Sequence, residues 1–439
     1  MRKILILGAG LVSRPIVRYF LDLGDTRVTV GSLYERDAKA LIDGHPLGTG
    51  LAVDVTRDEE VVPLVADCDL VVSLVPFDFH PRVARFAIDH HVHLVTASYL
   101  SEGMQALDNA AREAGVIVLN EVGLDPGLDH MSALRIIDDA RKRGGRVEKF
   151  SSCTGGLPSP EAADNPWKYR FSWSPRGALL AGLNPARYLK NGEVVEIPGP
   201  ELFNHQTDYP VEGVGDFEMY PNRDSMPYIE KYSLRGIDSI RRGTIRYPGW
   251  CRAMLALVKL DLFHRESPWR RGSTWASWTC ETLPASSASP RNRVTEFLGI
   301  PEHDDILDRM AWVGLFDETP LPDVDGSGVD LLAKLFNDRM SYEPEQRDMV
   351  LMRHELVCRF PDGSTETTVS ILESYGDPDG DSATSRTVSL PAAIAARNIL
   401  AGAKIEPGVW IPNQPVIYEP ILDELAGYGI RFFENTTHD

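Results

Sequence analysis

The sequence lacks the features that mark secreted, membrane-spanning and nucleic-acid-binding proteins. Its five cysteines, at positions 68, 153, 251, 280 and 358, form no CxxC pair, so we interpret them as reduced thiols of a cytoplasmic protein. No apolar run is long enough to cross a bilayer, and we expect no signal peptide because the chain begins directly with a strand. The net charge of −19 argues against non-specific binding of nucleic acid.

The N-terminal third of the chain alternates short apolar runs with helical stretches, the first helix being Pro15–Leu23. These runs are continuously apolar rather than alternating, as the strands of a parallel sheet buried on both faces must be. The alternation with helices therefore predicts an α/β fold with a Rossmann-type, doubly wound parallel sheet. The predicted strands are Ile4–Leu7, Arg27–Val30, Gly50–Val55, Leu70–Pro76, His93–Ser98 and Val116–Asn120.

The turn after the first strand reads Gly-x-Gly, at Gly8 and Gly10, and then has Ser13 where a dinucleotide-binding motif prefers a third glycine. Gly8 permits a sharp turn, and Gly10 lets a pyrophosphate approach the backbone at the start of the next helix. Ser13 is small enough to replace a glycine that serves helix–strand packing. A plain strand-to-helix turn is the alternative, but the strand before and the helix after favour a cofactor site.

The end of the second strand decides between NAD and NADP. An NAD site usually has an acidic residue there, whereas this sequence has Ser32 and Leu33, followed by Arg36. Ser32 can donate a hydrogen bond to a 2′-phosphate and Arg36 can neutralise it, so the sequence favours NADP and leaves NAD open. Asp54, after the third strand, binds the adenine side of the cofactor in one interpretation and caps a turn in the other.

Several longer motifs follow in the middle and at the end of the chain. They cover residues 96–104 (TASYLSEGM), 120–131 (NEVGLDPGLDHM), 155–180 (GGLPSPEAADNPWKYRFSWSPRGALL), 220–228 (YPNRDSMPY), 242–250 (RGTIRYPGW), 386–400 and 418–425. Together with GAGLVSRP at residues 8–15, these motifs closely resemble the glutamate-forming saccharopine dehydrogenases, also called saccharopine reductases. The resemblance covers nearly the whole chain.

The resemblance implies an NADP(H)-dependent reaction that joins glutamate and 2-aminoadipate semialdehyde through an imine, which is reduced to saccharopine. Saccharopine carries three carboxylates and two amines, so its site needs cations and hydrogen-bond donors. Arg223, in a turn-rich motif, is a candidate for bidentate carboxylate binding, although it can also be a surface arginine. Thr244, Ile245 and Arg246 offer a hydroxyl, backbone N–H groups and a guanidinium for another carboxylate, unless they form an ordinary strand with an exposed arginine.

Ser98, Tyr99 and Asp125 follow the fifth and sixth predicted strands, where the ligand crevice of such a sheet lies. We expect Ser98 and Tyr99 to orient the substrate, with a capping serine and a buried tyrosine as the alternative. Asp125 is the candidate for binding the substrate amine or transferring a proton, and Tyr99 is the second catalytic candidate. His130 is either a general base or a structural histidine in the first turn of a helix.

Trp173, Arg176 and Cys153 complete the candidates. Trp173 and Arg176 are predicted to lie between cofactor and substrate, although Trp173 can equally be a core residue; Cys153 is a substrate contact or a small buried residue. We expect no metal site, because the histidines show no ligand spacing. The full set predicted to contact the cofactor is Gly8, Gly10, Leu11, Val12, Ser32, Arg36, Asp54, Val75, Pro76, Ser98, Leu124, Asp125 and Arg176.

The pattern changes after the cofactor sheet. We expect a Rossmann domain over residues 1–125, an α+β substrate-binding domain with a mixed sheet over 126–385, and a C-terminal segment over 386–439 that returns to the Rossmann domain. Pro391 is predicted in the first turn of a helix over 392–400. The expected partners are small-molecule substrates and a second copy in a homodimer, with no membrane and no nucleic acid.

Two rival functions remain open. One is a related reductive-amination enzyme for another amino acid or a polyamine, which we expect to change the carboxylate-binding arginines. The other is a nucleotide-sensing or scaffolding protein without chemistry, which we expect to lose the loop at Asp125. The presence of Arg223, Arg246 and Asp125 favours saccharopine dehydrogenase activity.

Overall fold

The computed structural model describes residues 1–264, 266, 269, 272–323 and 326–438. The chain divides into two compact units, one formed by Met1–Val147 with Leu356–Asp439 and the other by Glu148–Glu355. These boundaries differ from those expected at residues 125 and 385. One reason is that α7 (Leu128–Lys142) packs against α16 (Pro415–Gly427) within the first unit.

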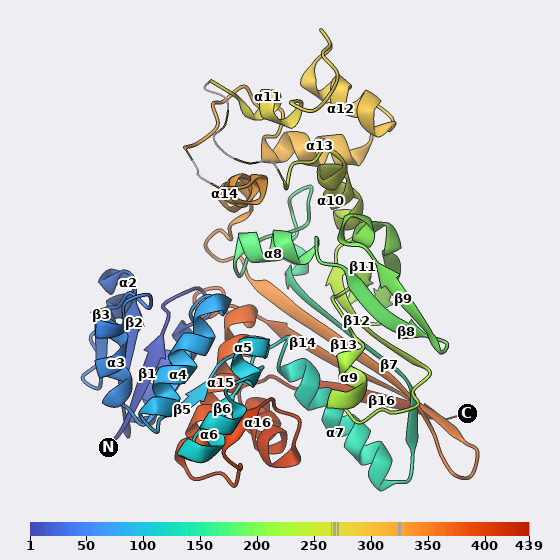
Figure 1. The fold of residues 1–439 in the computed structure, drawn as a ribbon. Helices are drawn as coiled ribbons and strands as arrows, with labels where there is room; N and C mark the ends of the chain where they lie inside the picture. The colour runs from blue at the N-terminus through green and yellow to red at the C-terminus, as the bar shows by residue number, and fades with distance from the viewer. Residues whose placement is uncertain (265, 267–268, 270–271, 324–325, 439) are drawn as a thin grey trace. The chain divides into compact units, whose positions relative to one another are not determined.

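A seven-stranded sheet forms the centre of the first unit, in the order β15-β6-β5-β4-β1-β2-β3 (Figure 1). All of its strand pairs are parallel, so the predicted doubly wound α/β sheet is confirmed. The chain adds strands on one side of β1 and then crosses to β4 on the other side. The strands are β1 (Arg2–Leu7), β2 (Thr26–Ser32), β3 (Gly48–Ala52), β4 (Leu70–Ser73), β5 (His93–Val95), β6 (Ile117–Leu119) and β15 (Gly408–Trp410).

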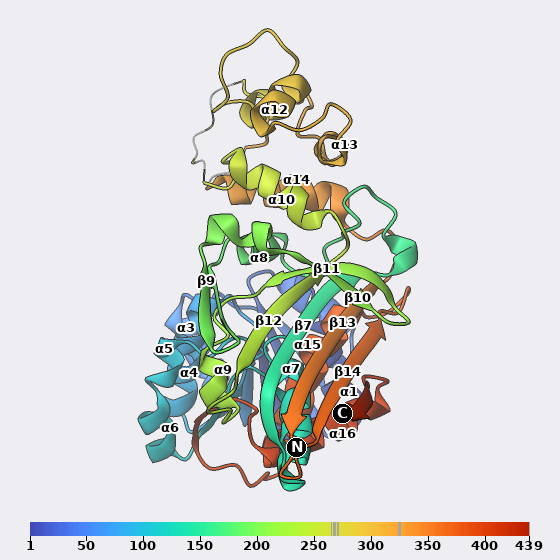
Figure 2. The same cartoon turned by 90° about the vertical axis from the view of Figure 1, so that its right-hand side faces the viewer.

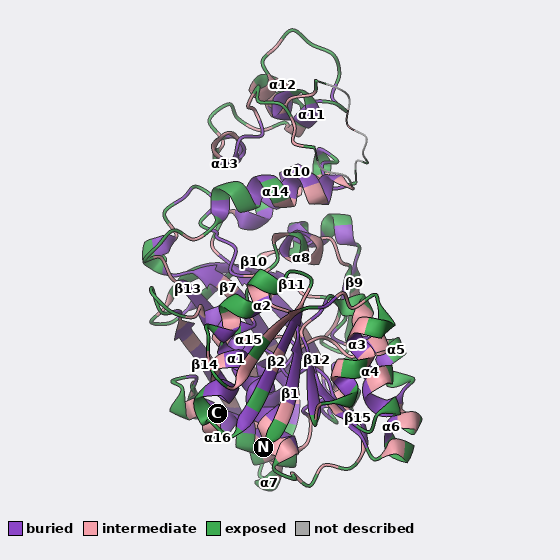
Figure 3. Ribbon diagram, turned by 90° about the vertical axis from the view of Figure 1, so that its left-hand side faces the viewer, coloured by how far each residue is buried: buried purple, intermediate pink, exposed green. Residues whose placement is uncertain are grey.

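Helices cover both faces of this sheet (Figure 3). On one face, Leu5, Val71 and Leu94 share a buried cluster with side chains of α3 and α4. On the other face, α1 and α15 pack against each other and against the strands. The helices are α1 (Arg14–Leu23), α2 (Glu35–Ile42), α3 (Asp58–Ala66), α4 (His80–Asp89), α5 (Glu102–Gln105), α6 (Asp108–Ala114) and α15 (Ala383–Leu400), with a 3₁₀ turn at Phe77–Phe79.

The C-terminal segment returns to the first sheet, as predicted, because β15 pairs with β6 in parallel. The prediction for Pro391 is wrong. The helix α15 begins at Ala383, where the hydroxyl of Ser382 accepts a hydrogen bond from Ser385 N–H, and Pro391 lies in its interior. Hydrophobic periodicity did not predict the first half of α15, because the serines and threonines before Pro391 are polar although they are buried in the structure.

A second, mixed sheet has the order β10-β11-β12-β7-β13-β14-β16, with β8 paired to β12 and β9 (Figure 2). The strand β12 is parallel to β7 and antiparallel to β11, so the predicted mixed sheet is confirmed. Its strands are β7 (Arg146–Pro158), β8 (Ala186–Lys190), β9 (Glu193–Ile197), β10 (Thr207–Val211), β11 (Gly215–Pro221), β12 (Ser239–Arg246), β13 (Asp348–Arg359), β14 (Thr365–Tyr375) and β16 (Phe432–His438).

The second unit adds helices around an aromatic core. Trp167 and Tyr169 lie with ring centroids 5.8 and 4.4 Å from that of Trp250, and all three are buried. The helices are α8 (Pro175–Ala181), α9 (Pro227–Lys231), α10 (Trp250–Lys259), α11 (Trp275–Thr279), α12 (Pro290–Leu298), α13 (Asp305–Val313) and α14 (Gly328–Met340), with 3₁₀ turns at Pro160–Ala162 and Gly199–His205.

Candidate active site

The turn between β1 and α1 has the backbone geometry that the Gly-x-Gly motif predicts. Gly8 has a φ of +116°, and a Cβ there would lie 2.7 Å from the carbonyl oxygen of Leu74, so glycine is required. A Cβ on Gly10 would meet nothing within 4 Å. Because Leu74 follows β4, the turn lies where the strand order reverses, which is the ligand crevice of a doubly wound sheet.

Ser13, in the place of the third glycine, is buried and closes the turn on itself. Its hydroxyl accepts a hydrogen bond of 3.1 Å from Gly10 N–H, and its own N–H donates one of 3.1 Å to the Gly10 carbonyl. The carbonyl of Val12 accepts a hydrogen bond from the Ser389 hydroxyl of α15, whereas Leu11 is 67% exposed. The turn is therefore fixed on its helix side and open at Leu11.

The segment after β2 presents an aromatic ring and a cation to solvent. Leu33 and Tyr34 are exposed, and the guanidinium carbon of Arg36 lies 5.4 Å from the centre of the Tyr34 ring. Arg36 is 84% exposed and lies 3.3 Å from a carboxylate oxygen of Asp37. Ser32 ends the strand beside them. This set fits an adenosine 2′-phosphate, since the ring can stack on adenine and the guanidinium can bind phosphate.

Asp54 takes part in the turn that follows β3. Its Oδ1 accepts hydrogen bonds from the hydroxyl and the N–H of Thr56, at 2.7 and 2.9 Å, and these hold the pKa of Asp54 below its usual value. The structure thus shows the turn-capping role that the sequence left open. A contact of Asp54 with the adenine side of the cofactor remains a prediction.

His80 was not identified from the sequence, yet it lies beside predicted site residues. The chain leaves β4 through buried Val75 and exposed Pro76 and reaches His80 at the start of α4. The Nε2 atom of this buried imidazole lies 2.7 Å from the hydroxyl of Ser98, and Nδ1 lies 2.9 Å from the hydroxyl of Ser73. Its position after a strand of the cofactor sheet was the available signal.

Tyr99 and Asp125, the two catalytic candidates, are in contact. The Tyr99 hydroxyl donates a hydrogen bond of 3.0 Å to Oδ1 of Asp125. Asp125 is half-buried, whereas the residues on either side of it, from Glu121 to Leu124 and from Pro126 to His130, are buried. Asp125 is therefore the carboxylate of this loop that solvent or a ligand can reach, and it is hydrogen-bonded to the Tyr99 hydroxyl.

A buried polar pair lies within the same loop. Nε2 of His130 lies 2.8 Å from Oε2 of Glu121, and both side chains are at most 1% exposed. The other oxygen of Glu121 accepts a hydrogen bond of 3.0 Å from the N–H of Leu100, next to Tyr99. The pair thus connects the segment that carries Tyr99 to the start of α7. The contact of His130 with Glu121 agrees with a structural histidine, and a role as general base is not tested. The sequence analysis did not identify Glu121, because a glutamate after a strand gives no sign of burial.

In the second unit, Arg246 is a buried cation, 3% exposed at the end of β12. Its guanidinium lies 5.1 and 5.7 Å from the ring centres of Tyr169 and Trp250, and Nη1 donates a hydrogen bond to the carbonyl of Ile245. Among the residues that the structure describes, the Nε atom of Arg246, the Tyr169 hydroxyl and the hydroxyl of buried Thr154 find no hydrogen-bond partner. Tyr169 and Thr154 were also missed by the sequence analysis.

This arrangement is suited to an anionic ligand. Among the described residues, no carboxylate forms an ion pair with Arg246. The carboxylate of Glu218, which lies opposite Arg246 in the β11–β12 pairing, stabilises this cation electrostatically but forms no ion pair with it. A carboxylate ligand would add a direct partner and satisfy the unbonded donor. Thr244 and Ile245 precede Arg246 on β12, so a single strand end offers the predicted hydroxyl, backbone and guanidinium groups.

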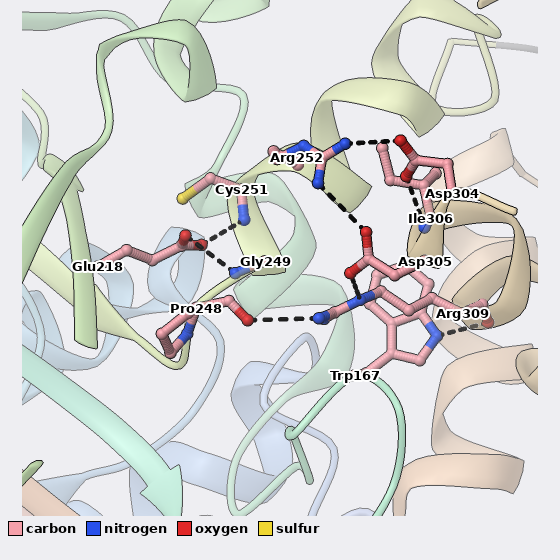
Figure 4. Close-up of polar contacts among 10 residues, drawn as sticks. All are labelled: Trp167, Glu218, Pro248, Gly249, Cys251, Arg252, Asp304, Asp305, Ile306 and Arg309. Carbon is pink, nitrogen blue, oxygen red and sulfur yellow. Dashed lines mark hydrogen bonds and ion pairs between the residues drawn. The ribbon is translucent and has the colours of Figure 1, made fainter. Parts of the chain in front are cut away.

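The turn after Arg246 is held by a polar network (Figure 4). The buried carboxylate of Glu218 accepts hydrogen bonds from Gly249 N–H at 3.0 Å and from Cys251 N–H at 2.6 Å, where α10 begins. Arg309 donates to the carbonyl of Pro248 at 3.3 Å and lies 3.1 Å from Asp305. The network fixes the start of α10, which carries the Trp250 ring against Arg246.

Arg223 lies in the turn after β11 and is exposed. It has a φ of +52°, unusual for a residue other than glycine, and its carbonyl accepts a hydrogen bond of 3.0 Å from Arg187 N–H. The motif YPNRDS therefore forms a specific turn that directs the arginine outward from the strand end.

The remaining candidates differ in exposure. Trp173 is half-buried, and a Cβ on Gly177 would lie 2.8 Å from its ring, so the ring covers the first turn of α8. Arg176, predicted to contact the cofactor, belongs to the second unit and forms an ion pair of 2.7 Å with Asp330. Cys153 is fully buried, and burial raises the pKa of its thiol.

The structure therefore brings Ser98, Tyr99 and Asp125 together in the first unit, and Thr244, Ile245 and Arg246 together in the second. In the part of the chain that is described, no group of three or more His, Cys, Asp or Glu side chains is arranged to hold a metal ion. None of the helices in these described ranges combines the length and the apolarity needed to cross a membrane.

Comparison with known families shows to which protein family the chain belongs. Residues 4–119 match the family model described as saccharopine dehydrogenase NADP binding domain, and residues 123–430 match the saccharopine dehydrogenase C-terminal domain. The chain belongs to the saccharopine dehydrogenase family. Because residues 4–119 match an NADP-binding domain, the prediction of NADP as the cofactor is confirmed.

Individual members of the family are similar over nearly the whole length of this chain. The chain is 38% identical to saccharopine dehydrogenase [NADP(+), L-glutamate-forming] of Pyricularia oryzae over 98% of both chains. It is 37% identical to the mitochondrial alpha-aminoadipic semialdehyde synthase of Rattus norvegicus, of which it covers 48%. The structure matches apo saccharopine dehydrogenase (L-Glu forming) from Saccharomyces cerevisiae with a TM-score of 0.91, 34% identity and full coverage of both chains.

Proposed function

We propose that this protein interconverts saccharopine with L-glutamate and 2-aminoadipate semialdehyde, using NADP(H). The observation that carries the proposal is the similarity over 98% of both chains to a relative named as the NADP(+)-dependent, L-glutamate-forming enzyme. The buried Arg246, which forms no ion pair with a described carboxylate, supports the substrate class, because saccharopine carries three carboxylates.

The substrate residues act by charge and hydrogen bonding. Arg246 binds one carboxylate of saccharopine, together with the hydroxyl of Thr244 and the backbone of Ile245. Arg223 binds a second carboxylate, for which its planar guanidinium offers two parallel hydrogen bonds. Trp173 and Cys153 line the same site in this proposal, the ring by packing against the substrate chain and the thiol by close approach.

The cofactor residues follow the strand ends of the first sheet. Gly8, Gly10, Leu11 and Val12 hold the pyrophosphate, Ser32 and Arg36 bind the 2′-phosphate, and Asp54 binds the adenine side. Val75, Pro76, Ser98, Leu124, Asp125 and Arg176 surround the nicotinamide half. When bound, the nicotinamide accepts a hydride from the substrate carbon next to the secondary amine.

Asp125 and Tyr99 handle protons in the proposed reaction. Loss of hydride turns the secondary amine of saccharopine into an imine, which water then attacks. The Asp125 carboxylate accepts a hydrogen bond from the amine and takes up a proton as the imine is hydrated. Tyr99, which donates to Oδ1 of Asp125 at 3.0 Å, keeps that carboxylate oriented.

The compartment and assembly belong to the same proposal. We propose a cytoplasmic enzyme, because the five cysteines are scattered along the sequence and form no CxxC pair. We also propose a homodimer, to be tested by sedimentation of the purified protein.

Product analysis tests the reaction. The purified protein is incubated with saccharopine and NADP⁺, and the amino acids released are identified by mass spectrometry. The proposal expects glutamate and an aldehyde in equal amounts with NADPH. Release of lysine in place of glutamate, or no release from a protein that binds NADPH, would overturn it.

A further inference from the structure

Both ring nitrogens of His80 are bonded to serine hydroxyls. Ser73, at the end of β4, lies 2.9 Å from Nδ1, and Ser98, after β5, lies 2.7 Å from Nε2. Ser73 and His80 are buried, whereas Ser98 is half-buried and can reach a ligand. The three side chains form a line from the interior of the first unit to the predicted ligand crevice.

The imidazole in this line is neutral at physiological pH. Burial lowers the pKa of His80 to about 4, which removes it from the range in which histidine usually titrates. A neutral imidazole has one N–H, so one serine accepts a hydrogen bond from the ring and the other donates one to it. The two serines therefore have opposite roles: when the Ser73 hydroxyl donates to Nδ1, Nε2–H donates to the Ser98 hydroxyl, and in the other tautomer Ser98 donates to Nε2.

The backbone of Ser98 is already fixed without the histidine. Its carbonyl accepts a hydrogen bond of 3.0 Å from Glu121 N–H, and its N–H donates one of 3.3 Å to the hydroxyl of Thr96. The remaining freedom is rotation of the Ser98 side chain and of its hydroxyl hydrogen, each of which has several staggered positions. Within the described part of the chain, the contact that restrains this hydroxyl is the one with His80.

We infer that His80 is a positioning residue of the active site, which holds the hydroxyl of Ser98 in one orientation toward the bound ligand. His80 transfers no proton and touches no substrate; its whole effect passes through Ser98. The inference rests on the proposed function, because it assumes that Ser98 contacts saccharopine or the nicotinamide half of NADP(H).

Two conservative variants distinguish the roles of the two ring nitrogens of His80. The amide of His80→Gln reaches the position of Nε2 and can still bond Ser98, whereas the shorter amide of His80→Asn reaches only the position of Nδ1 and Ser73. We expect His80→Asn to lower kcat/KM for saccharopine about tenfold, the effect of one neutral hydrogen bond, and His80→Gln to stay within about threefold of the native value.

A double-variant cycle supplies the decisive readout. If His80 acts through Ser98, the pair H80N/S98A has the kcat/KM of S98A alone, within about twofold. Losses that multiply, or equal losses in His80→Gln and His80→Asn, would overturn the inference. Melting temperatures of all four proteins check that each variant is folded under the assay conditions.

A spectroscopic measurement keeps this inference separate from the proposed function. If the native protein does not turn over saccharopine, the proposed function fails first. Nitrogen-15 NMR of labelled histidines then tests the contact itself. The inference expects a neutral, single tautomer for His80 at neutral pH and a shift of its Nε2 resonance in Ser98→Ala; an unshifted Nε2 resonance would overturn it.

Discussion

The hydroxyl of Tyr99 donates a hydrogen bond of 3.0 Å to Oδ1 of Asp125. The two residues are far apart in sequence, but they follow β5 and β6, which are parallel neighbours in the first sheet. Their strands therefore end at the same edge, which is where a doubly wound sheet binds its ligands. In the proposed reaction this contact orients the carboxylate that receives a proton from the substrate.

Replacing the carboxylate tests that role. We expect Asp125→Asn to lower kcat at least about a hundredfold, the usual effect of losing a general base, because the amide cannot take up a proton. Tyr99→Phe leaves the carboxylate in place and is expected to lower kcat only about tenfold. Steady-state rates of saccharopine oxidation measure both variants.

Cofactor binding is the control for these variants. NADPH fluorescence titrations should give the same Kd for the native protein and for Tyr99→Phe. An Asp125→Asn variant with native kcat would show that the proton goes elsewhere, for example to a bound water.

Arg246 is predicted to serve binding rather than stability. We expect Arg246→Met to lower kcat/KM for saccharopine about a hundredfold, because a charged hydrogen-bond donor to a carboxylate is lost. The melting temperature without substrate should change little, since the variant removes a buried cation that forms no ion pair with a described residue and loses only the longer-range attraction to Glu218. Thermal unfolding with and without saccharopine measures both effects.

Arg170 provides a matched control for Arg246. It is also buried in the second unit, but it pairs with Asp164 at 2.8 Å and donates to the carbonyls of Ala162 and Ser341. Arg170→Met should therefore lower stability by about 2 kcal/mol, because buried acceptors lose their partner. If Arg246→Met destabilises the protein as much as Arg170→Met does, Arg246 is a structural residue.

Glu218 is predicted to stabilise the start of α10. Its two oxygens accept hydrogen bonds from Gly249 N–H and Cys251 N–H, so Glu218→Ala leaves one half-buried and one buried donor without acceptors and should cost about 2 kcal/mol. Glu218→Gln keeps one acceptor and should cost roughly half as much. Urea unfolding curves measure the difference, and equal losses in the two variants would contradict this capping role.

The buried imidazole of His80 gives a pH dependence of stability. Its folded pKa of about 4 lies below the ordinary value of 6.5, so between these values the unfolded chain binds more protons than the folded one. The contribution of His80 to stability is complete above pH 6.5 and is lost as the pH falls toward 4. Between pH 7.5 and pH 5 the loss is about 2 kcal/mol.

The variant His80→Asn isolates this effect from other titrating groups. The difference in unfolding free energy between native protein and His80→Asn should shrink between pH 7.5 and pH 5. A difference that is constant over this range would mean that the imidazole titrates normally in the folded protein.

Arg36 is predicted to select NADP. We expect Arg36→Ala to raise KM for NADP⁺ about tenfold and to leave KM for NAD⁺ unchanged, because only NADP⁺ carries the 2′-phosphate. Lys39→Ala is the control, since Lys39 is also an exposed, ion-paired cation of α2. Equal effects of the two variants on NADP⁺ would point to the net charge of the surface instead of a specific contact.

The sequence was sufficient where the signal is local. Gly8 and Gly10 lie between a strand and a helix, so the pattern alone predicted the turn, and continuous apolar runs predicted the parallel sheet. The position of Pro391 led to a wrong prediction of where the helix begins, because the first half of α15 is a polar stretch that is buried by tertiary packing. Local patterns contain no information on such burial.

The residues that were missed depend on contacts between distant segments. His80 could be recognised only by its contacts with Ser73 and Ser98, which follow two different strands. Glu121 could be recognised only by its contacts with His130 and with the backbone of Leu100. In the same way, a resemblance of motifs predicted Arg246, but only the structure shows that its charge is buried and forms no ion pair with a described residue.

The most direct test of the account compares initial rates of saccharopine oxidation with NADP⁺ and NAD⁺ side by side, followed by nicotinamide absorbance. The account predicts turnover with NADP⁺ and a higher kcat/KM for NADP⁺ than for NAD⁺. Turnover that favours NAD⁺ would contradict the roles of Ser32 and Arg36. The absence of turnover with both cofactors, in a protein that binds NADPH, would contradict saccharopine as the substrate.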